Sequence, residues 1–133
     1  MHSPKRYAPI TATVATPMED LRLEATERDG VAVLAVFGEV DVATAPQLRQ
    51  MLVETASAGH QRVVVDLTQV EFLDSTGLGV LVSGLKRFRT FGGDLTVAGA
   101  QARVRKVFDI TGLTNVFGLH ETVDDAVAAF TAP

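Results

Sequence analysis

The spacing of apolar residues predicts that the patterned part of the chain begins with a β-hairpin. Leu21, Leu23 and Ala25 alternate with polar residues, and an apolar run follows at 31–37. The Arg-Asp-Gly segment at 28–30 separates the two stretches. Alternating runs joined by a short segment of this composition are typical of two antiparallel strands. We therefore expect the first regular structure to be a hairpin that starts at residue 21.

Beyond the hairpin, the pattern switches between a helical period and short apolar runs. The helical stripes lie at 48–55, 78–88, 104–111 and 123–130. Thr44 and Pro46 predict the start of the first helix, and Thr122 predicts the start of the last. The runs 62–67, 95–98 and 116–119 predict strands, the first of them buried on both faces of a sheet.

Helices that alternate with strands after a hairpin predict an α/β fold. Each strand-helix-strand unit crosses over in the right-handed sense and covers the sheet with its helix. We expect a single domain at 21–133, with a mixed sheet of four to five strands and about four helices. Residues 1–20 contain three prolines and no sustained period, which predicts a flexible tail. Because the patterning starts abruptly at Leu21, Met18 is a possible natural start.

Composition narrows the classes of function. The chain has 133 residues with 12 basic and 16 acidic side chains, a formal net charge of −4. Broad binding to a nucleic-acid backbone needs clustered cations, so we expect no nucleic-acid partner. The absence of cysteine excludes thiolate metal sites and cysteine nucleophiles. No apolar run approaches the ~18 residues of a membrane helix, so we expect a cytoplasmic protein with no membrane contact.

Motifs for nucleotide binding and hydrolysis are incomplete. Gly77 and Gly79 begin a dinucleotide fingerprint, but Val82 occupies the place of its third glycine. Leu85 stands where a Walker loop needs a lysine, and no G-x-S-x-G elbow surrounds Ser75. The three histidines are too widely spaced for a metal-ligand pattern. We therefore predict a protein that is not an enzyme and that holds no metal and no cofactor.

The segment after the central strand contains a serine with two possible roles. Ser75 lies where a helix begins, so its hydroxyl can cap that helix. Gly77, Gly79 and Gly84 each cost a helix about 1 kcal/mol relative to alanine, which indicates close approach of a neighbour or a partner. An accessible hydroxyl beside such glycines is also a phosphate acceptor, where added charge would lie next to Asp74. The residues alone leave both roles open.

The same segment resembles a known family. The run Asp-Ser-Thr-Gly-Leu-Gly-Val at 74–80, preceded by the strand at 62–67, is similar to the signature of STAS-domain anti-sigma factor antagonists. The segments 38–41 and 108–113 resemble two further blocks of that family. The resemblance extends from Leu21 to Phe130.

The resemblance implies a bacterial partner-switching protein without catalysis of its own. Its unphosphorylated form would bind an anti-sigma factor that is also a serine kinase, and a sigma factor would be released. The kinase would phosphorylate Ser75, and a PP2C-type phosphatase would reverse the reaction. Thr76 supplies a second hydroxyl, but Ser75 is favoured because it directly follows Asp74. The nucleotide and Mg²⁺ would belong to the kinase.

The resemblance also implies a partner-binding surface around Ser75. Its residues would be Glu39, Asp41, Asp74, Thr76, Gly77, Leu78 and Gly79. An alternative function within the same fold is a non-phosphorylated STAS scaffold or ligand-binding subunit of a stress-sensing or lipid-transport assembly. The sequence does not determine the sigma factor, the pathway or the oligomeric state. The basic residues of the second and third predicted helices are interpreted as solvated helix faces, with an interaction patch as the alternative. They are Lys86, Arg87, Arg89, Arg103, Arg105 and Lys106.

Overall fold

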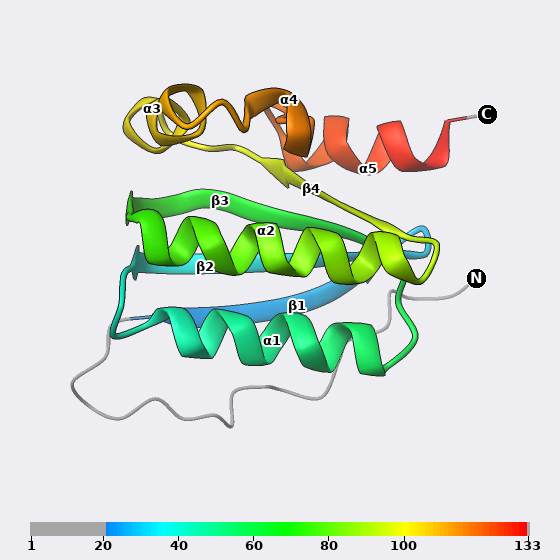
Figure 1. Cartoon of the computed structure of the whole chain (residues 1–133). Coiled ribbons are helices and arrows are strands. Elements are labelled where there is room, and N and C mark those ends of the chain that lie inside the picture. The colour runs from blue at the N-terminus through cyan, green and yellow to red at the C-terminus, as the bar shows by residue number, and fades with distance from the viewer. Residues whose placement is uncertain (1–20, 133) are drawn as a thin grey trace.

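A four-stranded mixed sheet is the centre of the computed structural model, which describes residues 21–132 (Figure 1). The strands lie in the order β1-β2-β3-β4, with β1 antiparallel to β2 and the other three strands parallel. Their bounds are Arg22–Arg28 for β1, Val31–Val40 for β2, Arg62–Leu73 for β3 and Asp94–Ala98 for β4. This confirms the predicted α/β class and mixed sheet. The predicted tail at 1–20 and the possible start at Met18 lie outside the described residues.

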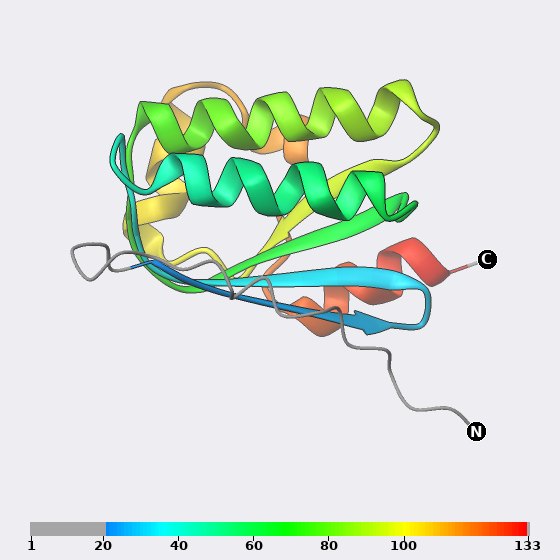
Figure 2. The same cartoon turned by 90° about the horizontal axis from the view of Figure 1, so that it is seen from below.

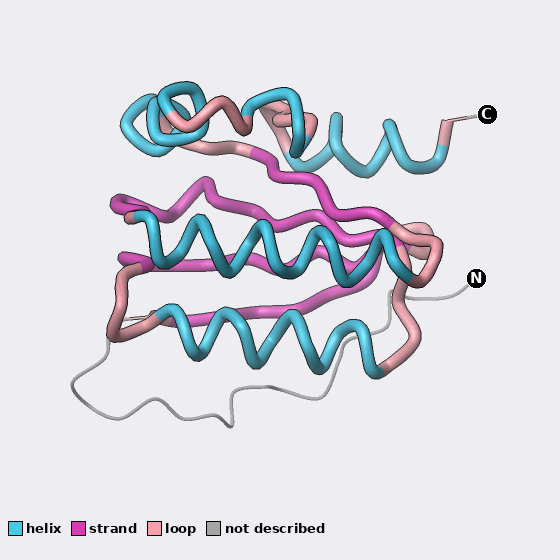
Figure 3. The backbone as a smooth tube through the Cα atoms, viewed as in Figure 1, coloured by secondary structure: helices cyan, strands magenta, loops and turns pink. Residues whose placement is uncertain are grey.

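Five helices occur within these residues and cover the sheet unequally. Their bounds are Ala45–Ser57 for α1, Ser75–Thr90 for α2, Ala102–Ile110 for α3, Thr114–Phe117 for α4 and Val123–Thr131 for α5. The helices α1 and α2 lie side by side on one face, and α5 lies on the other (Figure 2). The two crossovers that contain α1 and α2 advance in the same direction across the sheet, which places both helices on one side. The helices α3 and α4 lie beyond β4, at that side of the sheet (Figure 3).

The predicted hairpin is confirmed, and its turn explains why. Asp29 and Gly30 both have positive φ, 53° and 82°. A two-residue turn with positive φ at both positions matches the right-handed twist of paired strands, and Asp-Gly is a favoured sequence for it. The register pairs Arg28 with Val31 and continues to Arg22 opposite Phe37. The antiparallel edge strand therefore follows from local turn chemistry.

The main core lies between the sheet and the pair α1 and α2. The predicted stripes are buried there, namely Leu48, Met51, Leu52 and Thr55 on α1 and Leu78, Leu81, Leu85 and Phe88 on α2. Strand residues such as Leu34, Val36 and Val65 contribute the sheet side of this core. Each fully buried side chain of this size contributes about 1.5–3 kcal/mol relative to exposure. These contacts hold α1 and α2 against the sheet, and the first residues of both helices lie at the carboxyl ends of β2 and β3.

The predicted strand at 116–119 is wrong. That segment instead holds the single turn of α4, followed by Gly118 with φ 61°, and only an isolated bridge joins Ala98 to His120. Phe117 packs edge-on against Phe108, with ring centroids 5.4 Å apart, and is buried. Leu113 and Phe117 lie only about 6 Å apart along a helical turn, whereas a strand would separate them by about 13 Å. The sheet therefore has four strands rather than five.

The strand β3 is longer than its predicted span of 62–67. It continues to Leu73, and its pairing with β2 shifts register between Ala35 and Phe37 and between Gly38 and Glu39. Irregular pairing of this kind breaks strict alternation, so the buried positions after Leu67 are three residues apart. As a result, only Asp74 separates the end of β3 from α2.

Candidate functional site

The carboxyl ends of β2 and β3 bring the two predicted site segments together. Val40 and Leu73 are paired at the ends of these parallel strands, and the Asp74 backbone N–H donates to the Val40 carbonyl at 3.1 Å. Residues that follow adjacent parallel strands meet at one edge of the sheet, where ligands and partners of α/β folds commonly bind. The segment 41–44 therefore lies beside the first turn of α2 (Figure 1).

Asp74, not Ser75, caps α2. The Asp74 backbone is extended, with φ −99° and ψ −175°, and its Oδ1 accepts from the backbone N–H groups of Thr76 at 2.9 Å and Gly77 at 3.0 Å. The interpretation of Ser75 as the helix cap is therefore wrong. Ser75 is the first helical residue, its side chain is exposed, and its hydroxyl makes no hydrogen bond within residues 21–132. The hydroxyl is thus free for chemistry at the surface.

The loop between β2 and α1 is held by its own side chains. Asp41 Oδ1 accepts from the backbone N–H groups of Ala43 at 2.9 Å and Thr44 at 3.1 Å. The buried Thr44 hydroxyl donates to the Glu39 carbonyl at 2.8 Å and accepts from the Asp41 N–H at 3.0 Å. Thr44 is the N-cap residue of α1 with Pro46 next in the first turn, as predicted, although its side chain does not bond the helix. The loop therefore presents the Asp41 carboxylate in a defined position.

The three glycines of α2 have different neighbours. A Cβ on Gly77 would lie 2.6 Å from Val40 Cγ1 and 2.7 Å from Leu73 Cδ1, and a Cβ on Gly84 would lie 2.9 Å from Leu52 Cδ1. These two positions are glycine because the helix approaches its own core closely. Gly79 is exposed, and a Cβ there would meet nothing within 4 Å. Only Gly79 leaves open space at the surface, on the same face as Ser75 four residues earlier.

The structure places the residues predicted to bind a partner at different depths. Glu39, Thr76 and Gly79 are exposed, and Asp41 and Asp74 are half-buried. Gly77 and Leu78 are buried, so they shape the first turn of α2 from beneath. All seven lie at or next to the edge where β2 and β3 end.

Two apolar residues at the same edge were missed from the sequence. Val42, in the loop after β2, is 72% exposed, and Phe72, one residue before the end of β3, is 43% exposed. Glu39 pairs with Phe72 in the sheet register. The sequence signal for this exposed apolar surface is the apolar Val42 directly after Asp41. Exposed apolar residues beside a functional segment are typical of protein contact sites.

The edge is also acidic. Glu39, Asp41, Glu71 and Asp74 all lie there, and none of the three ion pairs among residues 21–132 involves them. The same part of the chain contains no group of three or more His, Cys, Asp or Glu side chains that could hold a metal ion. None of its helices is long and apolar enough to cross a membrane. The site is therefore a surface with the exposed hydroxyls of Ser75 and Thr76, four carboxylates and two apolar side chains.

Comparison with known proteins identifies the family. A family model for the STAS domain matches residues 22–126. The chain belongs to the STAS domain family. An anti-sigma-B factor antagonist of Staphylococcus epidermidis is 36% identical over 102 residues, which cover 77% of this chain and 94% of that protein. An anti-sigma factor antagonist from Mycobacterium paratuberculosis has the same fold in its crystal structure, with a TM-score of 0.77, 32% identity and coverage of 87% of this chain and 97% of that one.

A more distant STAS structure shares the fold alone. The anti-sigma factor antagonist SpoIIAA in its unphosphorylated form has a TM-score of 0.71 and 22% identity over 86% of this chain and 98% of its own. The Bacillus SpoIIAA in the phosphorylated form has a TM-score of 0.64 and 21% identity over 84% and 99%. The STAS fold of this chain thus resembles a protein solved in both phosphorylation states.

Proposed function

We propose that this STAS protein is an anti-sigma factor antagonist whose binding is switched by phosphorylation of Ser75. The unphosphorylated form binds an anti-sigma factor serine kinase through the edge formed by β2, β3 and the start of α2, and a sigma factor is released. The single observation that carries the proposal is the exposed, unbonded Ser75 hydroxyl beside the Asp74 cap. The name of the staphylococcal relative supports the coarser function of antagonist.

Electrostatics gives a reason for the switch. A phosphate adds a charge of about −1.5 to −2 and three acceptor oxygens. On Ser75 this charge would lie beside the carboxylates of Asp74 and Asp41, at an edge that is already acidic. The amino-terminal end of α2 carries a partial positive charge that accommodates the phosphate within the domain. The fold is therefore retained, while a partner surface arranged for a neutral hydroxyl is lost.

The surface around Ser75 is suited to a protein partner. Gly79 leaves space for a partner backbone to approach one turn after Ser75. Val42 and Phe72 provide exposed apolar area on either side of the strand ends, and Glu39 and Asp41 provide polar groups around it. An apolar centre with a polar rim is the usual arrangement of a specific interface.

The catalytic groups of the switch lie on its partners. The kinase supplies the nucleotide and Mg²⁺, a PP2C-type phosphatase removes the phosphate, and this chain supplies the hydroxyl without a cofactor. Thr76 is also exposed and its hydroxyl is unbonded within the described part, so it is the second possible acceptor. Because its proposed partners control transcription, we expect the protein to act in the cytoplasm.

Substitution of Ser75 tests the proposal. Ser75→Asp, which adds a charge, should lower affinity for the cognate anti-sigma factor kinase by at least about tenfold. Ser75→Ala should bind as wild type and stay bound when ATP is added. Ser83→Asp is the matched control, because Ser83 is an exposed serine two turns further along α2. Calorimetric titration measures all three variants.

Two outcomes separate the alternatives. If Ser75→Asp binds the kinase as tightly as Ser83→Asp does, the phosphorylation switch is wrong. If Ser75 also gains no phosphate from the kinase and ATP, the non-phosphorylated scaffold or ligand-binding subunit becomes the better account.

A further inference from the structure

A second site lies at the other end of α2. A pocket of about 290 Å³ opens between the last turn of α2, the outer edge of β4, α4 and α5. Arg89, in its wall, follows Ser75 by fourteen residues on one helix, which is about 20 Å at ~1.5 Å per residue. The pocket is therefore separate from the edge that carries Ser75.

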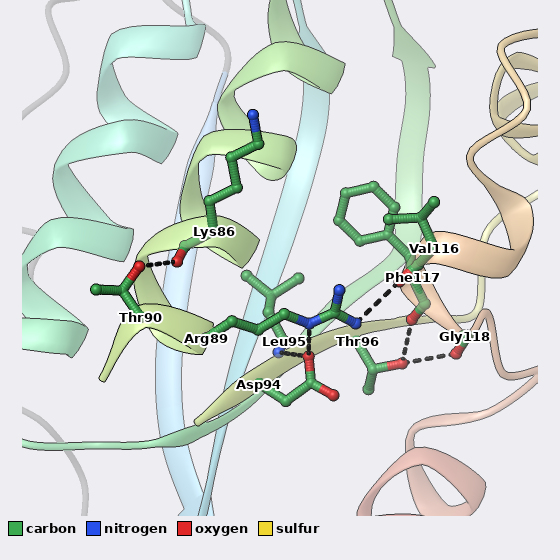
Figure 4. Close-up of polar contacts among 9 residues, drawn as sticks. All are labelled: Lys86, Arg89, Thr90, Asp94, Leu95, Thr96, Val116, Phe117 and Gly118. Carbon is green, nitrogen blue, oxygen red and sulfur yellow. Dashed lines mark hydrogen bonds and ion pairs between the residues drawn. The ribbon is translucent and has the colours of Figure 1, made fainter. Parts of the chain in front are cut away.

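The guanidinium of Arg89 is held in place but keeps free donors. Its Nε donates to Asp94 Oδ1 at 3.0 Å, and its Nη2 donates to the Val116 carbonyl at 3.2 Å, so the side chain reaches from α2 across to α4 (Figure 4). Within residues 21–132, Nη1 has no partner. A cation fixed in this way loses little conformational entropy when it binds a ligand.

Asp94 is engaged on one of its two oxygens. Its Oδ1 accepts from Arg89 Nε and also from the Leu95 backbone N–H at 2.9 Å (Figure 4). The ion pair of Arg89 and Asp94 is neutral overall. Arg89 retains the N–H groups of Nη1 as donors, and Asp94 retains Oδ2 as an acceptor. An incoming acceptor would therefore bind on the Arg89 side of the pair.

Of the remaining polar side chains of the pocket, one already forms a hydrogen bond and two do not. The Thr96 hydroxyl is engaged, because it lies 2.8 Å from the Phe117 carbonyl and 2.6 Å from the Gly118 carbonyl. The Asn115 amide and the His120 imidazole line the pocket and have no side-chain hydrogen bond within the described residues. Together with Arg89 Nη1 they form a set of free donors around one opening.

The rest of the wall is apolar. Phe117 and Ala126 are buried, and Phe130 and Ala129 complete the side formed by α5. Pockets that bind small molecules are mostly apolar with a few converging polar groups, and their volumes are about 300–1,000 Å³. This pocket is at the lower limit of that range, so it suits a ligand the size of one substituted ring.

We propose that this pocket binds a small carboxylic acid with an apolar body. The carboxylate accepts from Arg89 Nη1, with Asn115 and His120 beside it, and the apolar body contacts Phe117 and Phe130. Arginine is a preferred partner for a carboxylate because a hydrogen bond between two charged groups is stronger than one between neutral groups. The pocket is independent of the proposed switch at Ser75.

Three probes of equal shape and different charge test this proposal. Benzoate, benzamide and benzylamine are titrated into the full chain, and backbone amide shifts are recorded by NMR. Benzoate should give saturable shifts at Thr96, Gly118 and Phe130 and none at Ser75. Benzamide should bind at least about tenfold more weakly, because it lacks the charge that strengthens a hydrogen bond to a guanidinium.

Variants assign the binding to this pocket. Arg89→Gln should weaken benzoate at least about tenfold, whereas Arg87→Gln, an exposed neighbour that does not line the pocket, should not. Ala129→Leu narrows the pocket from α5 without touching Arg89 and should also abolish binding with the amide spectrum otherwise unchanged. The proposal is overturned if benzylamine binds best, if all three probes bind equally, or if benzoate gives no saturable shift up to about 10 mM.

Discussion

Asp74 determines what Ser75 is free to do. Both residue types are good helix caps, and the sequence alone does not decide between two adjacent candidates. The extended backbone at Asp74 decides it, because its carboxylate then accepts two N–H groups of the first turn. Ser75 is left with an exposed hydroxyl at the first helical position. A residue that could have been purely structural is thus available for modification.

Removal of the Asp74 cap should destabilise the fold. Asp74→Ala loses two hydrogen bonds to the first turn of α2, and we expect it to lower the free energy of unfolding by about 1 kcal/mol. Asp74→Asn keeps an accepting oxygen and should stay closer to wild type. Urea unfolding followed by circular dichroism measures both variants. Equal stability of the two variants would show that the cap does not depend on these hydrogen bonds.

The glycines of α2 give a matched pair of substitutions. Gly77→Ala places a methyl group against Val40 and Leu73, and we expect it to cost about 1–3 kcal/mol. Gly79→Ala meets open space and removes a helix-disfavouring glycine, so it should raise the free energy of unfolding by up to about 1 kcal/mol. Thermal and urea unfolding compare the two. Similar effects of both substitutions would contradict the proposed difference in packing.

At the scale of elements, the sequence correctly predicted those helices and strands whose formation depends on neighbouring residues. The hairpin follows from the Asp29-Gly30 turn, and α1 and α2 follow from their apolar stripes. The extension of β3 could not be predicted in this way, because its register shifts against β2 remove the alternation that marks a strand. The exposure of Phe72 depends on that same extension, which is why the apolar part of the site was missed.

The helix α4 shows how tertiary contact overrides a short pattern. Its last two residues, Val116 and Phe117, were predicted as part of a strand, but burial of Phe117 against Phe108 favours a helical turn. The buried Thr96 hydroxyl on β4 also lies within hydrogen-bond distance of the Phe117 and Gly118 carbonyls at the end of that turn. Contacts between elements so far apart in sequence leave no signal in a local window.

Phe117 should therefore anchor α4 and the adjoining part of the core. Phe117→Ala removes a buried ring, and we expect it to lower the free energy of unfolding by about 3–5 kcal/mol. Val116→Ala, one residue earlier and exposed, should stay within about 0.5 kcal/mol of wild type. Chemical denaturation measures both, and a small loss for Phe117→Ala would mean that α4 is not part of the cooperative core.

At the scale of the whole molecule, two kinds of surface lie at opposite ends of α2. The carboxyl edge of β2 and β3 combines the free Ser75 hydroxyl with carboxylates that form no ion pair within residues 21–132. The far end of α2 holds a cationic side chain in a pocket. The net charge of −4 thus includes a local acidic edge, where a phosphate has its largest effect on an incoming partner.

Phosphorylation of the intact protein tests the central claim most directly. The wild-type chain is incubated with the anti-sigma factor kinase and ATP, its phosphorylation site is located by mass spectrometry, and its kinase affinity is measured before and after. The account predicts one phosphate on Ser75, a loss of affinity of at least about tenfold, and an unchanged amide spectrum away from the first turn of α2. A phosphate at another residue, or a Ser75-phosphorylated chain that binds as tightly as before, would contradict it.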